Sequence, residues 1–301
     1  MELVSRLRAA PRVATLVAFV CVAAQRVSAQ SIGRLVIDHA RTSAGDAWAV
    51  WTAPLHGGGR DWLTAVGVVG VAAAVSPFDD NIDRWAVGQR DDGTWHFLRP
   101  FREGGDAFSG RTVAPFAIGA LGVALITKSD GMLEGISGCA TSYGAATAVR
   151  DFVVYPLVSR TRPDSGRGVQ PPPATQGDQY HFTVPGTGDW GRHALPGGHV
   201  SNITSCVGFF VSRYKLGPFA VAPWAAVGAV AMARTLDRRH WASDQVVGAF
   251  LGYAVGREVA LRSLRRTENA SARRSAEHDE DGSFYFAPGV DGARVGWRRA
   301  F

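Results

Sequence analysis

His240 and Asp244 have the residue types and the spacing needed for chemistry on a phosphate group. They are four positions apart, so both lie on one face if a helix has already begun there. A carboxylate that holds one imidazole nitrogen leaves the other nitrogen free to attack phosphorus. Arg234 lies shortly before this pair and could bind a phosphate oxygen. The segment predicts a nucleophilic His240 oriented by Asp244, with a helix-capping ion pair as the alternative.

Two earlier segments suit the same chemistry. Arg162 stands directly before Pro163 at the exit of an expected helix, where its planar guanidinium could bind phosphate oxygens in pairs. Gly197 and Gly198 open a later helix, and the backbone N–H groups of such a start can point at an anion. His199 follows them and could protonate a leaving oxygen. Each segment alone also fits an ordinary helix end, so the prediction depends on finding all of them together.

Charge-free segments rich in alanine, glycine and valine must position these residues. Each segment is long enough for a helix and too long for an ordinary strand. We therefore predict an all-α protein built on a bundle of six helices. The six segments are 62–78, 112–127, 135–149, 194–212, 216–233 and 245–256.

The sequence leaves open whether this bundle lies in a membrane. A spanning helix needs about 17–25 apolar residues, and three of the six segments fall short of that length. The mean hydropathy of the whole chain is close to zero. This balance favours a soluble bundle or a protein on the membrane surface, with true membrane spans as the alternative.

The start of the chain is predicted to be an export signal. Residues 1–29 combine arginines, a short apolar run and the small-residue triplet Val27-Ser28-Ala29, as a cleaved signal peptide does. The mature helical domain would then cover 30–261, in a periplasmic or secreted protein with possible membrane association.

The end of the chain is predicted to lie outside the helical domain. Residues 262–282 are arginine-rich and then acidic, which indicates a solvated linker. Residues 283–301 contain the turn dipeptide Asp291-Gly292 between aromatic and apolar runs, which predicts a short β-hairpin docked on the bundle.

Charge and cysteine usage limit the partners. The net charge of +6 is concentrated at the two ends of the chain, so the helical domain has no basic excess for a nucleic acid. Cys139 and Cys206 each lie in an apolar segment, where a disulfide and two buried free thiols are both possible. No spacing of cysteine and histidine predicts a metal site.

Together, the three segments resemble the type 2 phosphatidic acid phosphatase and vanadium haloperoxidase superfamily. Its signature is Lys-x6-Arg-Pro, then Pro-Ser-Gly-His, then Ser-Arg-x5-His-x3-Asp, and the chain matches the order of the parts and the spacing of the third. The resemblance implies a six-helix core, a phosphohistidine formed on His240, orientation by Asp244 and a proton from His199. It implies no metal or other cofactor. The phosphate-binding groups that it implies are Arg162, Arg234 and the amides of Gly197 and Gly198.

Three positions depart from the signature. Tyr155 stands where the family has lysine, and Gly197 and Ala233 stand where it has serine. Each lost hydroxyl removes a hydrogen bond to phosphate of about 1.5–3 kcal/mol. We expect weakened or altered anion binding, with Arg150 or Arg160 as possible replacements for the missing cation.

The resemblance implies a phosphatase that acts on phosphomonoesters or lipid (pyro)phosphates and is inhibited by vanadate. A vanadate-dependent haloperoxidase is the alternative enzyme, although a permanently bound trianion needs the cation that the lysine would supply. A non-catalytic anion or lipid binder is the alternative that the departures favour. The loop 164–194 would select the substrate, and its candidate contacts are His181, Asp189, Trp190 and His193.

Overall fold

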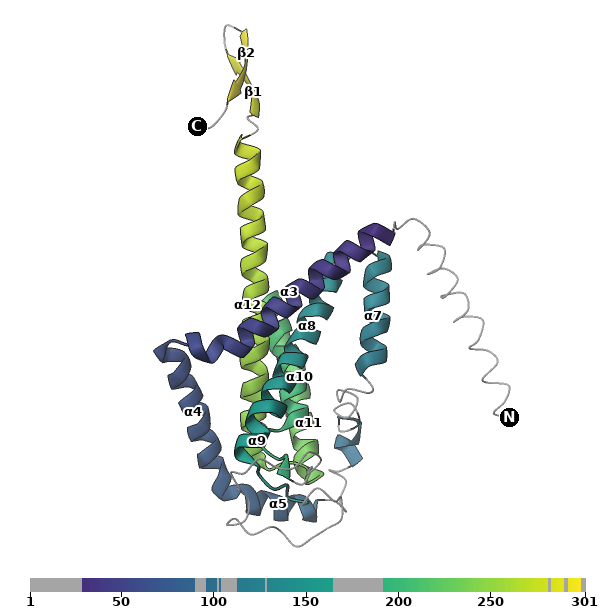
Figure 1. Cartoon of the computed structure of the whole chain (residues 1–301), viewed down its shortest axis with the longest axis vertical. Helices are drawn as coiled ribbons and strands as arrows, with labels where there is room; N and C mark the ends of the chain where they lie inside the picture. Colours follow the sequence, from purple (N-terminus) through teal and green to yellow (C-terminus); the bar gives the residue numbers. More distant parts are fainter. Residues whose placement is uncertain are drawn as a thin grey trace, which may run out of the picture.

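The computed structural model describes residues 29–89, 96–101, 103, 113–127, 129–164, 192–280, 283–289 and 292–298 (Figure 1). It confirms the all-α class. The signal-peptide prediction lies outside the described residues, apart from the last position. The main helices are α3 (Ala29–His56), α4 (Gly59–Val75), α5 (Asp79–Gly88), α7 (Val113–Thr127), α8 (Asp130–Val149), α9 (Tyr155–Val158), α10 (Gly198–Tyr214), α11 (Val221–Leu236) and α12 (Ala242–Glu280).

All six predicted segments are helical, as α4, α7, α8, α10, α11 and α12. Helices α3 and α5 were missed because charged residues interrupt their apolar pattern. Those charges have partners inside the protein: Asp46 of α3 and Asp79 of α5 are both buried and ion-paired with arginines. A search for charge-free segments therefore misses helices whose carboxylates face inward.

Helix α10 packs closely along α12 because α12 has glycines at the contact. Gly248, Gly252 and Gly256 recur every four residues and so lie on one helix face. A Cβ atom at Gly252 would lie 2.2 Å from the carbonyl oxygen of Ser201, and one at Gly256 would lie 2.1 Å from that of Ser205. Any larger residue would push the backbones apart, so this contact fixes the start of α10 against the start of α12.

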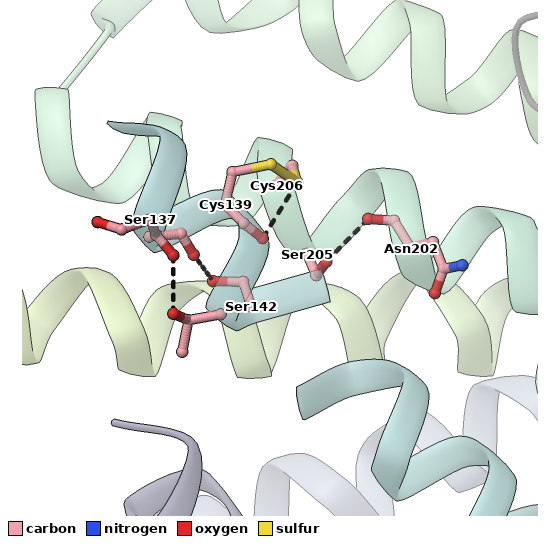
Figure 2. The surroundings of a disulfide bond; sticks show 8 residues. Ser137, Cys139, Ser142, Asn202, Ser205 and Cys206 are labelled. Atoms are coloured by element: carbon pink, nitrogen blue, oxygen red, sulfur yellow. Dashed lines mark hydrogen bonds between the residues drawn. A yellow bond between two sulfur atoms is a disulfide. The ribbon is translucent and has the colours of Figure 1, made fainter. Parts of the chain in front are cut away.

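A disulfide between Cys139 and Cys206 joins α8 to α10 (Figure 2). Of the two states left open by the sequence, the structure has the disulfide. The hydroxyls of Ser142 and Ser205 turn back onto carbonyl oxygens of their own helices, at 2.7 and 2.8 Å. Such bonds satisfy these small polar groups within each helix and leave the α8–α10 contact closely packed.

Helix α12 continues without a break to Glu280, so the stretch predicted to be a linker is helical as far as that residue. Arg262 and Arg266 reach Asp46 of α3 at 2.8 and 2.7 Å. The first turns of the charged stretch therefore pack on the bundle. Residues 265–273 are exposed, and exposure does not prevent a helix.

Strands β1 (Ser283–Gly289) and β2 (Gly292–Arg298) pair antiparallel, with Gly289 opposite Gly292. Both strands lie in the segment 283–301, for which the sequence predicts a hairpin. Figure 1 shows it at the far end of α12, away from the other helices. The expectation that it docks on the bundle is wrong, because the helical charged stretch carries it outward.

Two helical stretches are long and apolar enough to cross a membrane. Gly59–Gly88, which runs from α4 through α5, has 30 residues and a mean hydropathy of 1.5 over a window that is only 6% buried, and Gly217–Leu236 has 20 residues. Apolar side chains cover the outside of α4: Trp62, Leu63, Val66, Val69 and Val71. Exposed apolar patches of this kind mark contact with a membrane or a partner. The surface supports membrane association over the freely soluble bundle that the short segments favoured.

Candidate active site

The three segments predicted to carry chemistry meet at one end of the bundle. The N–H of Asp164 donates to the carbonyl oxygen of Arg238 at 3.2 Å, which joins the first segment to the third. The N–H of Gly197 donates to the carbonyl oxygen of Asp244 at 2.8 Å, which joins the second to the third. Backbone hydrogen bonds thus hold together loops that lie far apart in the sequence.

His240 is buried at this end, with one ring nitrogen fixed. Its Nδ1 lies 2.7 Å from the carbonyl oxygen of Ala194. Because a carbonyl can only accept, Nδ1 carries the proton and Nε2 holds the lone pair. Burial, followed by the positive charges of Arg162 and His199 and then Arg234, lowers the pKa of His240 well below 6.5. The imidazole is therefore neutral at neutral pH, as a nucleophile must be.

Arg162 and Arg234 flank His240 from different segments. The Nε and Nη2 atoms of Arg162 both donate to the carbonyl oxygen of His193, at 3.3 Å. Nη1 of Arg234 donates to Asp237 at 3.4 Å, and this arginine is only 2% exposed. Both arginines are close enough for their charges to act on His240, so the two predicted phosphate-binding side chains lie beside the predicted nucleophile. Such an arrangement can stabilise the charge that spreads over phosphate oxygens during phosphoryl transfer.

Asp244 does not contact His240 among the described residues. Its carboxylate accepts from Nη1 of Arg160 at 2.5 Å and from the N–H of Trp241 at 2.8 Å. The expectation that Asp244 orients His240 is wrong in this structure, and the carbonyl of Ala194 does so instead. The four-residue spacing places two side chains together only within a helix. Helix α12 begins at Ala242, and the preceding turn includes a left-handed residue, Arg238, with φ 56°.

Burial raises the pKa of Asp244 to about 6, although the Arg160 guanidinium and the Trp241 N–H both favour the ionised form. The carboxylate is therefore charged at neutral pH. Its charge is used to hold Arg160, which is also fully buried.

Two carboxylates of α5 hydrogen-bond to residues around the site. Neither was among the residues predicted from the sequence. Asp79 accepts from Nη2 of Arg160 at 2.7 Å and from the N–H of Ser243 at 3.0 Å. Asp83 accepts from Nε and Nη2 of Arg238, both at 2.7 Å. These bonds tie the turn before α12 to α5. The i, i+4 spacing of the two aspartates was the only signal, and it is common on helices.

Gly197 cannot serve as predicted, because its N–H already donates to Asp244. Helix α10 begins one residue later, at Gly198. The first N–H groups of a helix lack partners within the helix, so anion binding by the amide of Gly198 stays a prediction.

Neither candidate arginine replaces the missing lysine. Arg160 is held by Asp79 and Asp244, and Nη1 of Arg150 donates to the carbonyl oxygen of Gly198 at 3.1 Å. Tyr155 is buried and donates its hydroxyl to the carbonyl oxygen of Pro196 at 3.2 Å. Tyr155, at the position where the family has lysine, therefore holds the segment before α10 in place and supplies no cation.

Of the predicted substrate contacts, only His193 lies in the part of the chain that the structure describes. Its ring stacks on Tyr155, with centroids 4.6 Å apart, and its carbonyl oxygen holds Arg162. His193 therefore positions other groups of the site. His181, Asp189 and Trp190 lie outside the described residues.

Replacing Asp244 with asparagine tests this assignment. We expect the free energy of unfolding to fall by about 1.5–3 kcal/mol, because Arg160 loses one charged hydrogen bond and keeps its bond to Asp79. Turnover should fall less than 10-fold, with an unchanged acidic limb of the pH profile, because His240 keeps its bond to Ala194. Chemical denaturation and the pH dependence of kcat/KM measure the two effects.

Asp46→Asn is the matched control, since it removes a buried aspartate paired with two arginines at the other end of the bundle. It should lower stability without changing the pH profile. If Asp244→Asn instead left stability intact and reduced turnover by about 10⁴-fold, Asp244 would act directly on His240.

Residues 139–268, which contain all three segments, match the PAP2 superfamily. This family match supports a phosphatase-type function. No curated protein sequence matches the chain. A solved structure, "Crystal structure of the first transmembrane PAP2 type phosphatidylglycerolphosphate phosphatase from Bacillus subtilis", is similar with a TM-score of 0.44 and 16% identity, covering 66% of this chain and 94% of that chain.

Proposed function

We propose that this protein is a phosphatase that hydrolyses phosphomonoesters or lipid (pyro)phosphates through a phosphohistidine on His240. The observation that carries the proposal is the state of His240. It is buried and neutral, its Nδ1 proton is fixed by Ala194, and Arg162 and Arg234 lie beside it. This is the environment that a histidine needs to attack a doubly charged phosphate.

In the first step, the lone pair on Nε2 of His240 attacks phosphorus opposite the ester oxygen. The bond from phosphorus to that oxygen breaks, and His199 gives its proton to the departing oxygen. Arg162, Arg234 and the amide of Gly198 hold the remaining phosphate oxygens. The product alcohol leaves, and the phosphoryl group stays on nitrogen.

In the second step, His199 has become neutral and takes a proton from a water molecule. The water oxygen attacks phosphorus, and the electron pair of the phosphorus–nitrogen bond returns to Nε2. Inorganic phosphate leaves, with His199 protonated again. Every proton and charge in this scheme is handled by side chains, so we propose that no metal or other cofactor takes part and that vanadate inhibits by mimicking the transition state.

The surroundings of the site favour a membrane-borne substrate on the exported side. Apolar side chains cover the outside of α4. The stretch Gly217–Leu236, which contains Arg234 in its last turn, is long and apolar enough to span a bilayer. The Cys139–Cys206 disulfide suits an oxidising compartment. Together they support a periplasmic or secreted, membrane-associated enzyme.

Hydrolysis by the full-length protein in detergent or vesicles tests the proposal. We expect phosphate release from an aryl phosphate and from a lipid phosphate, unchanged by EDTA and blocked by vanadate. Loss of activity in EDTA that a divalent ion restores would contradict the mechanism. Vanadate-dependent halide oxidation without hydrolysis would identify a haloperoxidase, and anion binding without any turnover would identify a non-catalytic binder.

A further inference from the structure

Gln245, one residue after Asp244, has a buried amide with no hydrogen-bond partner among the described residues. The residue is 6% exposed, and neither Oε1 nor Nε2 forms a hydrogen bond there. A primary amide offers two donors and a carbonyl acceptor, so leaving it unpaired in the interior is costly. Buried polar groups left unpaired in this way call for a ligand or another explanation.

The amide of Gln245 lies at the start of α10, against Gly197. A Cβ atom built on Gly197 would be 2.4 Å from Oε1 of Gln245. Gly197 is the N-cap residue of this 17-residue helix, directly before the Gly198 amide. The unpaired amide therefore lies beside the N-cap residue of α10, next to the helix start, where N–H groups and the helix dipole stabilise an anion.

Position 197 itself supplies nothing to an anion. It has no side chain, and its N–H is used by Asp244. A side chain at 197 and the present placement of Gln245 exclude each other, because 2.4 Å is far below a van der Waals contact. The glycine thus creates the space that the glutamine fills.

We propose that Gln245 is a phosphate-binding residue of this site, whose amide N–H donates to an oxygen of the bound phosphate in place of a side chain at position 197. The amide can present either end by half a turn about its last bond. Gly197 and Gln245 then form a pair, in which the first makes room and the second supplies the donor. The proposal rests on the phosphatase function proposed above, because it assigns a donor to the same anion.

Gln245→Met keeps the length of the side chain and removes the amide. We expect the dissociation constants of vanadate and inorganic phosphate to rise about 10-fold to 100-fold, because one hydrogen bond to a charged group is lost. Isothermal titration of the full-length protein measures both anions without turnover. In a hydrolysis assay, kcat/KM for an aryl phosphate should fall by a similar factor.

Gly197→Ser in the Gln245→Ala background tests the pairing. The serine hydroxyl should then occupy the vacated space and recover much of the anion affinity lost in Gln245→Ala. In the wild-type background, the same serine should weaken binding, because its Cβ displaces the amide. This opposite response of one substitution in two backgrounds is not expected if Gln245 only fills space.

Thr204→Val is the matched control. Thr204 is a fully buried residue of α10 whose hydroxyl also has no partner among the described residues, and it lies further along the helix from the site. Its replacement should leave anion affinity unchanged. If Gln245→Met behaves like Thr204→Val, with unchanged affinity and equal or higher thermal stability, the proposal is overturned. If Gln245→Met does not fold, Gln245→Ala takes its place, and its anion affinity and thermal stability are interpreted by the same criteria.

The two proposals fail differently. A wild-type protein that binds vanadate but hydrolyses nothing would refute the phosphatase function and leave the Gln245 titrations decisive. A wild-type protein that hydrolyses phosphate esters while Gln245→Met keeps full affinity would refute only the role of Gln245. A wild-type protein that binds neither anion would overturn both.

Discussion

His240→Ala is expected to reduce phosphate release by at least about 10⁴-fold and to abolish the phosphoryl-enzyme. Without Nε2 there is no atom to attack phosphorus, and the arginines can only bind substrate. The wild-type enzyme, quenched during turnover of a ³²P-labelled substrate, should carry label that is lost in acid and kept in base, as a phosphohistidine requires. The variant should carry none.

His240→Asn guards against a folding defect, because its amide N–H can still donate toward the carbonyl of Ala194. It should fold as the wild type does and be equally inactive. His39→Ala is the matched control, since His39 contacts Ser137 toward the opposite end of α8, at 3.3 Å. It should keep both turnover and label. Hydrolysis by wild type without histidine-bound label would show that water attacks the substrate directly.

His199→Ala should produce an effect that depends on the leaving group. For an alkyl or lipid phosphate, whose leaving oxygen needs a proton, we expect kcat to fall by roughly 10²–10⁴-fold. For an aryl phosphate, whose oxygen leaves as a stable anion, the first step should slow much less. The measurement is kcat for a series of esters with leaving groups of increasing acidity.

A steeper dependence of rate on leaving-group acidity in His199→Ala than in wild type would establish His199 as the acid. Because His199 is also proposed to activate water, burst kinetics with the aryl ester should show label accumulating on His240. An equal loss for all esters, without accumulation of label, would instead place His199 in binding alone.

The positions of most helices could be predicted from local sequence because apolar residues must be removed from water over whole turns. Helices α3 and α5 were not predicted, because their buried aspartates have their partners elsewhere in the chain. Asp46 is matched by Arg262 and Arg266, far away in the sequence. In a sequence, a buried and ion-paired charged residue cannot be told from a solvated one, because its partner lies elsewhere in the chain.

Membrane association was underestimated for a related reason. The charged residues Asp79 and Asp80 ended the predicted apolar segment at residue 78, although the helical stretch continues to Gly88. Only the structure showed that the apolar side chains of α4 face outward, since a sequence does not tell which face of an apolar helix is covered by neighbouring helices.

By itself, the sequence determined which residues do the proposed chemistry: His240, His199, Arg162 and Arg234 are identified by their types and by short spacings at helix ends. Only the tertiary structure decided how they are held. The tautomer of His240 is set by the carbonyl of Ala194, and Asp244 is bound to Arg160. The unpaired amide of Gln245 lies against Gly197. Each of these contacts joins segments that are distant in the chain. The contacts of Ala194 and Gly197, which precede α10, depend on how closely α10 packs against α12, which local spacing does not encode.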